Sequence, residues 1–184
     1  ESRFLYFFFS KLVTIMQLLA GRYKGARIKT STKMPYRPTL SRIRKSLFDI
    51  LFPFNYQNVL DLFSGTGILG FEAASRGANT ITFVEKDRKS IQLLESNANQ
   101  FPDIDFVFNQ QDVYTFLNNP KSYDLIFADP PYTSSNNHEL VETVLKILNK
   151  NGKFILETNK RSQPMMNAIV KNYGNTIISI WTKE

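Results

Sequence analysis

The sequence predicts an α/β domain in which helices cover both faces of a mostly parallel sheet. From Asn58 onward, apolar segments alternate with segments of helical periodicity. The apolar segments are continuous runs with little polar alternation, which is typical of strands that are buried on both faces. A tight turn at Gly174-Asn175 then joins two further candidate strands near the carboxyl end of the chain.

We divide the chain into three parts. Residues 1–15 are an extension of uncertain origin, because their apolar run is too short to span a bilayer and is interrupted by Lys11. No small-residue cleavage site follows this run, so a secretory signal is not expected. Residues 16–52 form a small basic region, and residues 53–184 form the α/β domain.

The basic region is expected to contain a hairpin and a helix. Two short strands flank the stretch from Gly21 to Gly25. The following stretch "RPTLSRIRKSLFDILF" has the periodicity of an amphipathic helix, with Thr39 or Ser41 as its N-cap. We expect its apolar face to consist of Ile43, Leu47, Ile50 and Leu51, and Arg42, Arg44 and Lys45 to lie mostly off that face.

The α/β domain is expected to alternate strands with helices along its length. Glycine occurs where the first and last of its helices should end, at Gly77 and Gly152, which is a preferred glycine position. The expected strands are 58–63, 80–87, 105–112, 123–131, 153–158, 167–173 and 176–181, and the expected helices are 67–77, 88–101, 113–117 and 138–152.

The net charge of +7 is concentrated in the N-terminal quarter of the chain. Residues 1–52 carry eleven Lys and Arg against two acids, whereas the rest of the chain carries twelve basic and fourteen acidic side chains. This asymmetry favours a nucleic-acid partner, with Arg22, Lys24 and Arg27 of the hairpin as candidate phosphate contacts. A basic surface that serves only solubility is the alternative.

The chain has no cysteine and only one histidine, His138. Disulfides, thiolate metal sites and multi-histidine metal sites are therefore excluded, and the absence of cysteine fits a reducing compartment. We expect a monomer in the cytoplasm that binds neither a metal nor a membrane.

The first strand-to-helix turn, "DLFSGTGILG", has the spacing G-x-G-x-x-G at Gly65, Gly67 and Gly70. Such glycines let the backbone approach a ligand and let the helix pack on the strand. Asp61, at the end of the strand, would repel a pyrophosphate, so a ligand with an ammonium or sulfonium cation is favoured over a dinucleotide. The alternative is that Asp61 only caps a loop amide.

Two further acids end the next two strands. Glu85 is suited to accept hydrogen bonds from ribose hydroxyls, and Asp112 from an adenine amino group, although each could be a solvated strand-end acid. The carboxyl ends of parallel strands share one edge of a sheet, where ligands bind. We therefore expect Asp61, Glu85 and Asp112 to lie along that edge.

The stretch "FADPPY" ends the fourth strand at the same edge. Asp129 and the carbonyl of Pro130 can each accept one hydrogen of an exocyclic amino group, and Pro130 and Pro131 fix the direction of that carbonyl. Holding both hydrogens favours a pyramidal nitrogen whose lone pair can attack a methyl group, and Tyr132 can stack on the base. A strand end followed by a turn is the simpler explanation.

With these motifs in family order, the chain from Met16 to about Trp181 resembles the bacterial 16S rRNA guanine-N2 methyltransferases of the RsmD family. The matching stretches are "LAGRYKGARI", "RPTLSRIRKSLFDIL", "VLDLFSGTGILGFEAASRGA", "FVEKD" and "DLIFADPPY". The resemblance implies a Rossmann-like, class I S-adenosylmethionine-dependent methyltransferase with a seven-stranded sheet that ends in an antiparallel hairpin. It also implies 16S rRNA as substrate, either free or within the small ribosomal subunit.

The resemblance assigns roles to individual residues of this sequence. Asp61, Ser64, Gly65 and Gly67 would line the methyl donor, with Glu85 at its ribose and Asp112 at its adenine. The catalytic stretch from Asp129 to Tyr132 would hold the guanine. Arg37, Thr39, Arg42 and Arg44 would belong to the substrate-binding N-terminal region.

Three other functions remain open on the sequence. A DNA adenine methyltransferase or a protein glutamine-N5 methyltransferase can carry the same tetrapeptide. A non-catalytic RNA-binding module with a vestigial site is the second alternative. A nicotinamide-dependent dehydrogenase is the third, and the charge of Asp61 argues against it.

Overall fold

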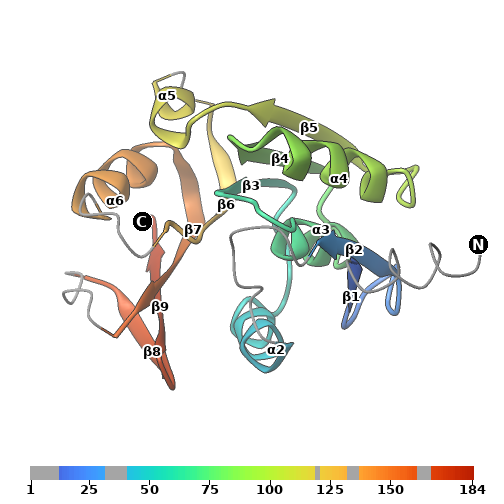
Figure 1. The fold of residues 1–184 in the computed structure, drawn as a ribbon. Helices are drawn as coiled ribbons and strands as arrows, with labels where there is room; N and C mark the ends of the chain where they lie inside the picture. The colour runs from blue at the N-terminus through green and yellow to red at the C-terminus, as the bar shows by residue number, and fades with distance from the viewer. Residues whose placement is uncertain (1–12, 32–40, 119–120, 132–136, 161–166) are drawn as a thin grey trace, which may run out of the picture.

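The computed structural model describes residues 13–31, 41–118, 121–131, 137–160 and 167–184 (Figure 1). The predicted site residues Arg37 and Tyr132, and the candidate cap Thr39, lie outside these ranges. The strands are β1 (Val13–Gln17), β2 (Arg27–Ser31), β3 (Asn58–Leu62), β4 (Thr80–Glu85), β5 (Asp105–Gln110), β6 (Tyr123–Ala128), β7 (Leu148–Asn159), β8 (Ile169–Tyr173) and β9 (Thr176–Thr182). The helices are α2 (Ser41–Ile50), α3 (Ile68–Ser75), α4 (Arg88–Ala98), α5 (Val113–Leu117) and α6 (Asn137–Lys146).

Seven strands form one sheet in the order β5-β4-β3-β6-β7-β9-β8. Strands β3 to β7 pair in parallel, whereas β9 is antiparallel to both β7 and β8. The predicted sheet with its C-terminal antiparallel hairpin is therefore confirmed. The chain moves outward from β3 to β5 and then returns to β6, so the direction of winding reverses between β3 and β6. Ligands of open α/β sheets bind at such a reversal, at the carboxyl ends of the strands.

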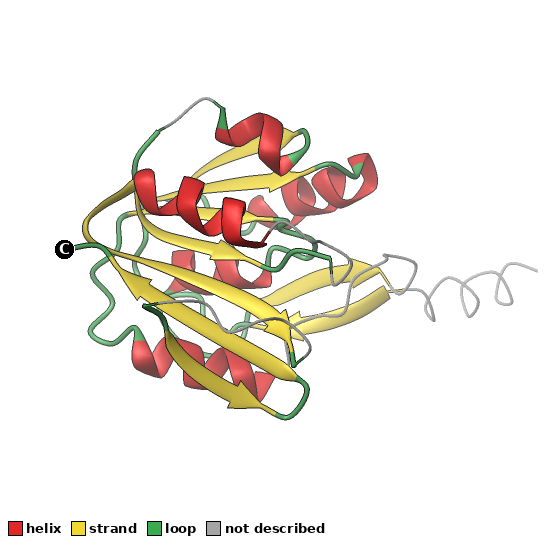
Figure 2. Ribbon diagram, turned by 90° about the vertical axis from the view of Figure 1, so that its left-hand side faces the viewer, coloured by secondary structure: helices red, strands yellow, loops and turns green. Residues whose placement is uncertain are grey.

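Helices cover both faces of this sheet, which explains the continuous apolar runs of the central strands (Figure 2). One face packs against residues of α2, α3 and α4, in a cluster that includes Val59, Phe83 and Phe127. The other face packs against α5 and α6 around Leu60 and Ile126. Among the described residues, no helix is long and apolar enough to cross a membrane.

The predicted N-terminal hairpin is present as the antiparallel pair β1 and β2, and its turn is docked on the end of α3. The backbone N–H of Arg22 donates to the carbonyl of Ser75 at 2.6 Å, and the Ser75 hydroxyl donates to the carbonyl of Ala20 at 2.6 Å. Gly21 has a φ of +85°, and a Cβ built on it would lie 1.8 Å from the Ser75 carbonyl oxygen. The close approach of the hairpin to α3 thus requires glycine at this position.

The boundaries of the parts differ from the expected ones. Strand β1 begins at Val13, inside the segment 1–15 that was assigned to an extension. Leu18 and Ile28 of the hairpin share one buried cluster with Leu47 of α2 and with the sheet, so the basic region 16–52 has no separate core.

The last helix of the α/β domain is shorter than predicted, and the strand after it is longer. Helix α6 ends at Lys146, not at residue 152, and β7 begins at Leu148. Asn151 has a φ of +62°, and its backbone N–H donates to Lys183 at 2.8 Å. Gly152 therefore lies in an irregular strand, where β7 shifts its register with β6, and does not cap a helix.

Candidate active site

Four acids lie on one face of the sheet near the carboxyl ends of its central strands. Asp61 of β3 pairs in register with Phe83 of β4 and with Phe127 of β6. Because side chains alternate along a strand, Glu85, two residues after Phe83, shares the face of Asp61. The same step from Phe127 leads to Asp129. We call Asp61, Glu85, Asp129 and Glu157 of β7 the carboxylate row.

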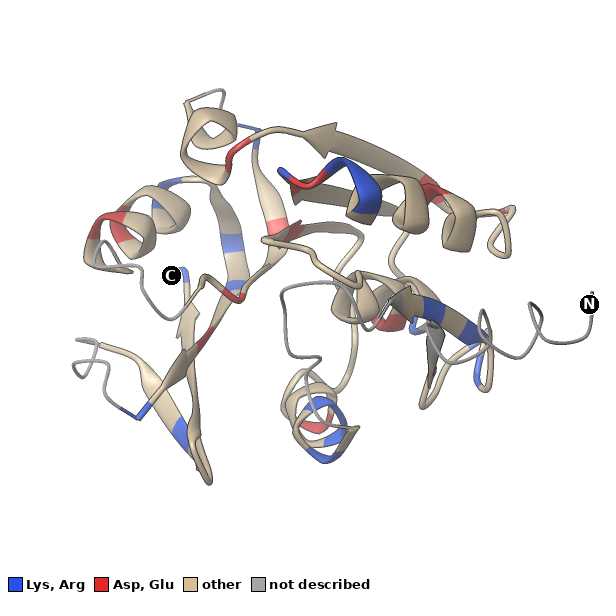
Figure 3. Cartoon of the chain, viewed as in Figure 1, with Lys and Arg blue, Asp and Glu red and all other residues tan. Residues whose placement is uncertain are grey.

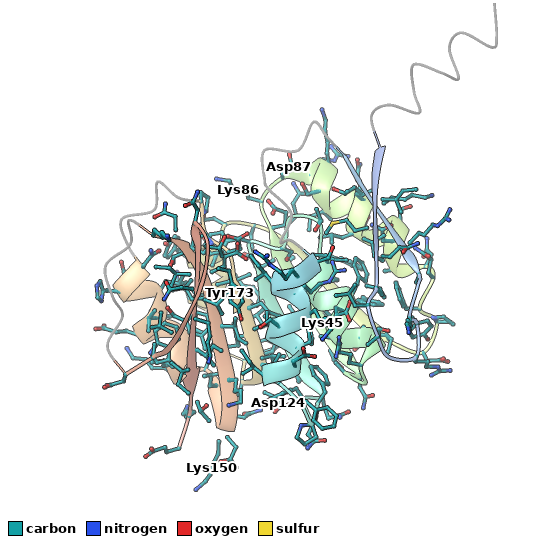
Figure 4. The ribbon with its side chains drawn as sticks, turned by 90° about the horizontal axis from the view of Figure 1, so that it is seen from below. Lys45, Lys86, Asp87, Asp124, Lys150 and Tyr173 are labelled. Atoms are coloured by element: carbon teal, nitrogen blue, oxygen red, sulfur yellow. The ribbon has the colours of Figure 1, made fainter. Side chains whose placement is uncertain are left out.

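Glu157 joins this row through β7. Phe127 pairs with Ile155, and Glu157 lies two residues beyond Ile155, so it is the β7 counterpart of Asp129. Figure 4 shows where the carboxyl ends of the strands lie: Lys86 and Asp87, which follow β4, mark this end, and Asp124 and Lys150 lie at the opposite end.

Asp61 lies at the centre of the carboxylate row. Its side chain is 4% exposed, and its Oδ2 accepts a hydrogen bond of 3.1 Å from the backbone N–H of Gly70. Burial raises the pKa of Asp61 well above its ordinary value, and the charges of Asp129 and Glu85 raise it further. The residue therefore accepts from an amide of α3, whereas the simpler alternative was an amide of the loop, and it also contributes to a concentration of negative charge that favours a cation.

The glycine turn is held by side chains from both adjoining strands. Glu85 accepts from the backbone N–H of Gly65 at 3.1 Å and from that of Asp87 at 2.9 Å. The Ser64 hydroxyl lies 2.6 Å from the Asp61 carbonyl oxygen and accepts the Val84 N–H at 2.9 Å. Ser64 therefore fixes the position of the turn through backbone contacts.

Left-handed backbone conformations occur at three positions of this turn. Gly65 has a φ of +51° and Gly67 a φ of +69°. Phe63 has a φ of +54°, which is costly for a residue with a side chain. Strain of this kind is common at ligand sites, and no sequence pattern indicates it at Phe63.

Asp129 directly follows β6 and is partly buried. Burial raises the pKa of Asp129 to about 8, and the charge of Glu157 contributes to the rise. Pro130 is buried and Pro131 is exposed, while Tyr132 lies outside the described residues. The structure thus brings Asp61 and Asp129 together, on the two strands between which the winding reverses.

Asp112 differs from the members of the carboxylate row in its exposure to solvent. It follows β5, the edge strand, and is exposed. Its Oδ1 accepts a hydrogen bond of 2.9 Å from the backbone N–H of Tyr114, so it is the N-cap of α5. A contact of Asp112 with an adenine remains a prediction.

In the described part of the chain, no cluster of three or more His, Asp or Glu side chains could hold a metal ion. The carboxylate row is spread along four strands and does not converge on one point. The chemistry that these residues can perform is the binding of a cation and the acceptance of hydrogen bonds from a polar group beside it.

Comparison with known proteins identifies the family. The family described as "Conserved hypothetical protein 95" matches residues 16–182 of the chain. A ribosomal RNA small subunit methyltransferase D of Haemophilus influenzae is 33% identical over an alignment of 147 residues, and the alignment covers 74% of this chain and 72% of that protein. The chain belongs to the RsmD family.

Solved structures agree with the fold. A putative methyltransferase of Escherichia coli, yhhF, has a TM-score of 0.79 at 25% identity and covers 93% of this chain and 99% of its own. A 16S rRNA N2 G1207 methyltransferase of T. thermophilus, solved with AdoMet and guanosine, has a TM-score of 0.74 at 18% identity and covers 94% of this chain and 50% of its own. The fold is that of the Rossmann-like, S-adenosylmethionine-dependent methyltransferases.

The basic residues that were predicted to bind RNA do not all lie on the surface. Lys and Arg are found on β2, on α2 and at the start of α4 (Figure 3). Arg22, Lys24, Arg27 and Arg42 are exposed, and Arg22 also forms an ion pair of 2.6 Å with Asp103.

The structure corrects the prediction that Arg44 contacts RNA. Its side chain is 1% exposed, it pairs with Glu72 of α3 at 3.5 Å, and it donates to the carbonyl of Gln17 at 2.5 Å. A buried guanidinium engaged in this way cannot contact RNA, so Arg44 joins the hairpin, α2 and α3 together.

Sequence reasoning missed two buried acids, Glu72 and Glu157. Glu72 is 0% exposed and accepts from the backbone N–H groups of Leu19 at 2.8 Å and Ala20 at 3.2 Å. It was the only charged residue within the apolar segment "GILGFEAAS", and that isolation was a usable signal. Glu157 directly follows the apolar run "FIL", as Glu85 follows "FV".

Proposed function

We propose that the chain transfers a methyl group from S-adenosylmethionine to the exocyclic N2 amino group of a guanine in 16S rRNA. The observation that supports this proposal is the carboxylate row, in which Asp61 and Asp129 lie on the same face of the sheet, on either side of the winding reversal, and their charges interact. Membership of the RsmD family supports the ribosomal substrate.

The residues around Asp61 fit a cationic methyl donor. Three buried or partly buried acids act on one another there, and a positively charged ligand would relieve their repulsion. Gly65 and Gly67 allow the left-handed backbone of the turn, and Glu85 keeps this turn in place; its carboxylate would also accept from a ribose hydroxyl. S-adenosylmethionine supplies a methyl group on a positively charged sulfur, and the T. thermophilus methyltransferase of the same fold binds AdoMet.

Asp129 and the carbonyl of Pro130 would orient the acceptor amine. An exocyclic amino group is a poor nucleophile because its lone pair is delocalised into the ring. When both hydrogens are held by acceptors, the nitrogen can direct its lone pair at the methyl carbon. The new N–C bond forms as the S–C bond breaks, the bonding pair stays on sulfur, and the extra proton on nitrogen passes to Asp129 or to water.

The exposed basic residues would supply contacts to RNA phosphates. Arg22, Lys24, Arg27 and Arg42 lie on the hairpin and on α2, and Arg37 lies between these elements in sequence. Contacts of this kind make binding dependent on salt and carry little sequence information.

A variant that lacks the Asp129 carboxylate tests the proposed function. Asp129→Ala is expected to lower methyl transfer to 16S rRNA by about 100-fold or more, because the amine loses one acceptor and its proton loses a nearby base. The affinity for S-adenosylmethionine, measured by calorimetry, should stay within about threefold. Transfer is measured with labelled S-adenosylmethionine on 16S rRNA, on small subunits and on DNA, and the product is located by mass spectrometry. Methylation of DNA alone, or an undiminished rate in Asp129→Ala, would contradict the proposal.

A further inference from the structure

Glu157 is the member of the carboxylate row to which the proposed mechanism gives no role. It lies on β7, and its side chain is 8% exposed. Leu156, the residue before it, pairs in register with Ala128, the residue before Asp129. Glu157 and Asp129 are thus the next neighbours across two adjacent parallel strands, on the same face of the sheet. The charge of Glu157 also helps to raise the pKa of Asp129, as expected for two neighbouring carboxyl groups.

Two neighbouring carboxylates offer a pattern of acceptors that fits only certain base edges. Guanine presents two adjacent donors, the N2 amino group and N1–H. Adenine and cytosine present an amino group beside a ring nitrogen that has a lone pair and no hydrogen. A carboxylate that faces this ring nitrogen would be repelled by it, whereas the same carboxylate accepts a hydrogen bond from N1–H of guanine.

We infer that Glu157 reads N1–H of the target base and so selects guanine, while the neighbouring Asp129 accepts from the N2 amino group. This inference rests on the proposed function and deepens it, because it names the residue that distinguishes guanine from other bases carrying an amino group. A site built around a hydrogen-bonding group rejects an analogue that lacks this group far more strongly than an apolar pocket does.

The test compares guanine with 2-aminopurine, which keeps the amino group but has no hydrogen on N1. The methylated guanine is first mapped in 16S rRNA treated with the wild-type protein. Two 16S rRNAs are then assembled by ligation, one with guanine and one with 2-aminopurine at that position. The wild-type protein is expected to prefer guanine by about 100-fold in kcat/KM.

The matching variant is Glu157→Gln, which keeps the shape of the side chain. Its amide can accept from N1–H of guanine or donate to N1 of 2-aminopurine, so the preference for guanine should fall to about tenfold or less. The control is Thr158→Val, on the same strand but on the other face of the sheet, where the side chain is 5% exposed. The preference of this control should equal that of the wild-type protein.

The outcomes separate the inference from the proposed function. If the wild-type protein places no methyl group on guanine N2, the proposed function fails. If it methylates guanine but treats 2-aminopurine equally well, Glu157 does not read N1–H. An unchanged preference in a folded Glu157→Gln variant overturns the inference too. The wild-type comparison needs no substitution, so equal rates on guanine and 2-aminopurine would overturn the inference even where Glu157→Gln does not fold.

Discussion

Arg44 of α2 and Glu72 of α3 form an ion pair that is almost completely buried, with 3.5 Å between Nε and Oε2. Glu72 also accepts from Arg76 at 2.9 Å and from two backbone N–H groups of the hairpin turn. Burial lowers the pKa of Arg44, and the charge of Glu72 raises it again. One carboxylate of α3 therefore holds both the hairpin and α2, the two elements that carry most of the predicted RNA contacts.

Removal of the Arg44 charge is expected to affect stability more than RNA binding. Arg44→Met keeps much of the packing volume but leaves the negative charge of Glu72 with one cation fewer, which should cost about 3 kcal/mol of unfolding free energy. Denaturation by urea measures this loss. In Arg42→Met, where the side chain is exposed, the unfolding free energy should change by less than about 0.5 kcal/mol.

RNA binding should show the opposite pattern for the same two variants. Arg42→Met should reduce the slope of log K against log salt concentration by about one, because one phosphate contact is lost. Arg44→Met should leave this slope unchanged at a temperature where it is folded. A change of slope in Arg44→Met alone would show that the buried pair opens when RNA binds.

Glycine at position 21 is expected to be necessary for docking of the hairpin. A Cβ at Gly21 would meet the backbone of Ser75, whereas one at Gly25 would meet no atom within 4 Å. The two residues have nearly equal φ values, +85° and +84°, so backbone strain is the same in both alanine variants. Gly21→Ala should therefore lose about 2 kcal/mol more unfolding free energy than Gly25→Ala. Hydrogen exchange should show loss of protection in β1 and β2 only for Gly21→Ala; equal protection in the two would contradict the requirement.

The sheet and the positions of its acids could be predicted because they depend on local patterns. The run Val59–Leu62 is apolar apart from Asp61, and the glycine turn follows it directly. In a parallel sheet this order places Asp61 at the ligand-binding edge, whatever the details of packing. Glu85 and Asp129 follow from the same rule.

The remaining features depend on contacts between distant segments, which periodicity does not encode. Helical spacing puts Arg44 beside Ile43 and Leu47 without showing that a buried acid on α3 faces it. Asp112 obeys the strand-end rule, but β5 is at the edge of the sheet, where an acid can remain exposed and cap the next helix. Gly152 reads as a helix end, and only the pairing of β7 with its neighbours shows that the strand continues through it.

Neutralising Asp61 is expected to stabilise the protein and weaken donor binding. The pKa of Asp61 is higher in the folded protein than in the unfolded chain, so its contribution to stability is fully present below the unfolded value and is lost as pH rises. In Asp61→Asn the side chain does not ionise, so stability is not lost in this way as the pH rises. Its amide oxygen can still accept from the backbone N–H of Gly70. The unfolding free energy of Asp61→Asn should therefore be higher than that of the wild-type protein, and the difference should be larger at pH 8 than at pH 5. Urea denaturation at both pH values measures it.

The same variant should bind S-adenosylmethionine about tenfold more weakly or worse, because the sulfonium loses a nearby negative charge. Calorimetry measures this affinity. Asp61→Ala separates charge from hydrogen bonding, since it also leaves the Gly70 N–H without its acceptor, at a cost of about 1–3 kcal/mol. Undiminished affinity in Asp61→Asn would assign this residue to helix capping alone.

Methyl transfer is expected to rise with pH up to the pKa of Asp129. This pKa is raised to about 8, so Asp129 is protonated below that value in the free protein and cannot take the proton from the amine. Because kcat/KM reports ionisations of the free enzyme, it should rise about tenfold per pH unit between pH 6 and 7 and level off above about pH 8. Glu157→Gln removes a negative charge that contributes to the shift, and its profile should therefore level off at a lower pH. A flat profile from pH 6 to 9 would show that deprotonation of Asp129 does not limit transfer.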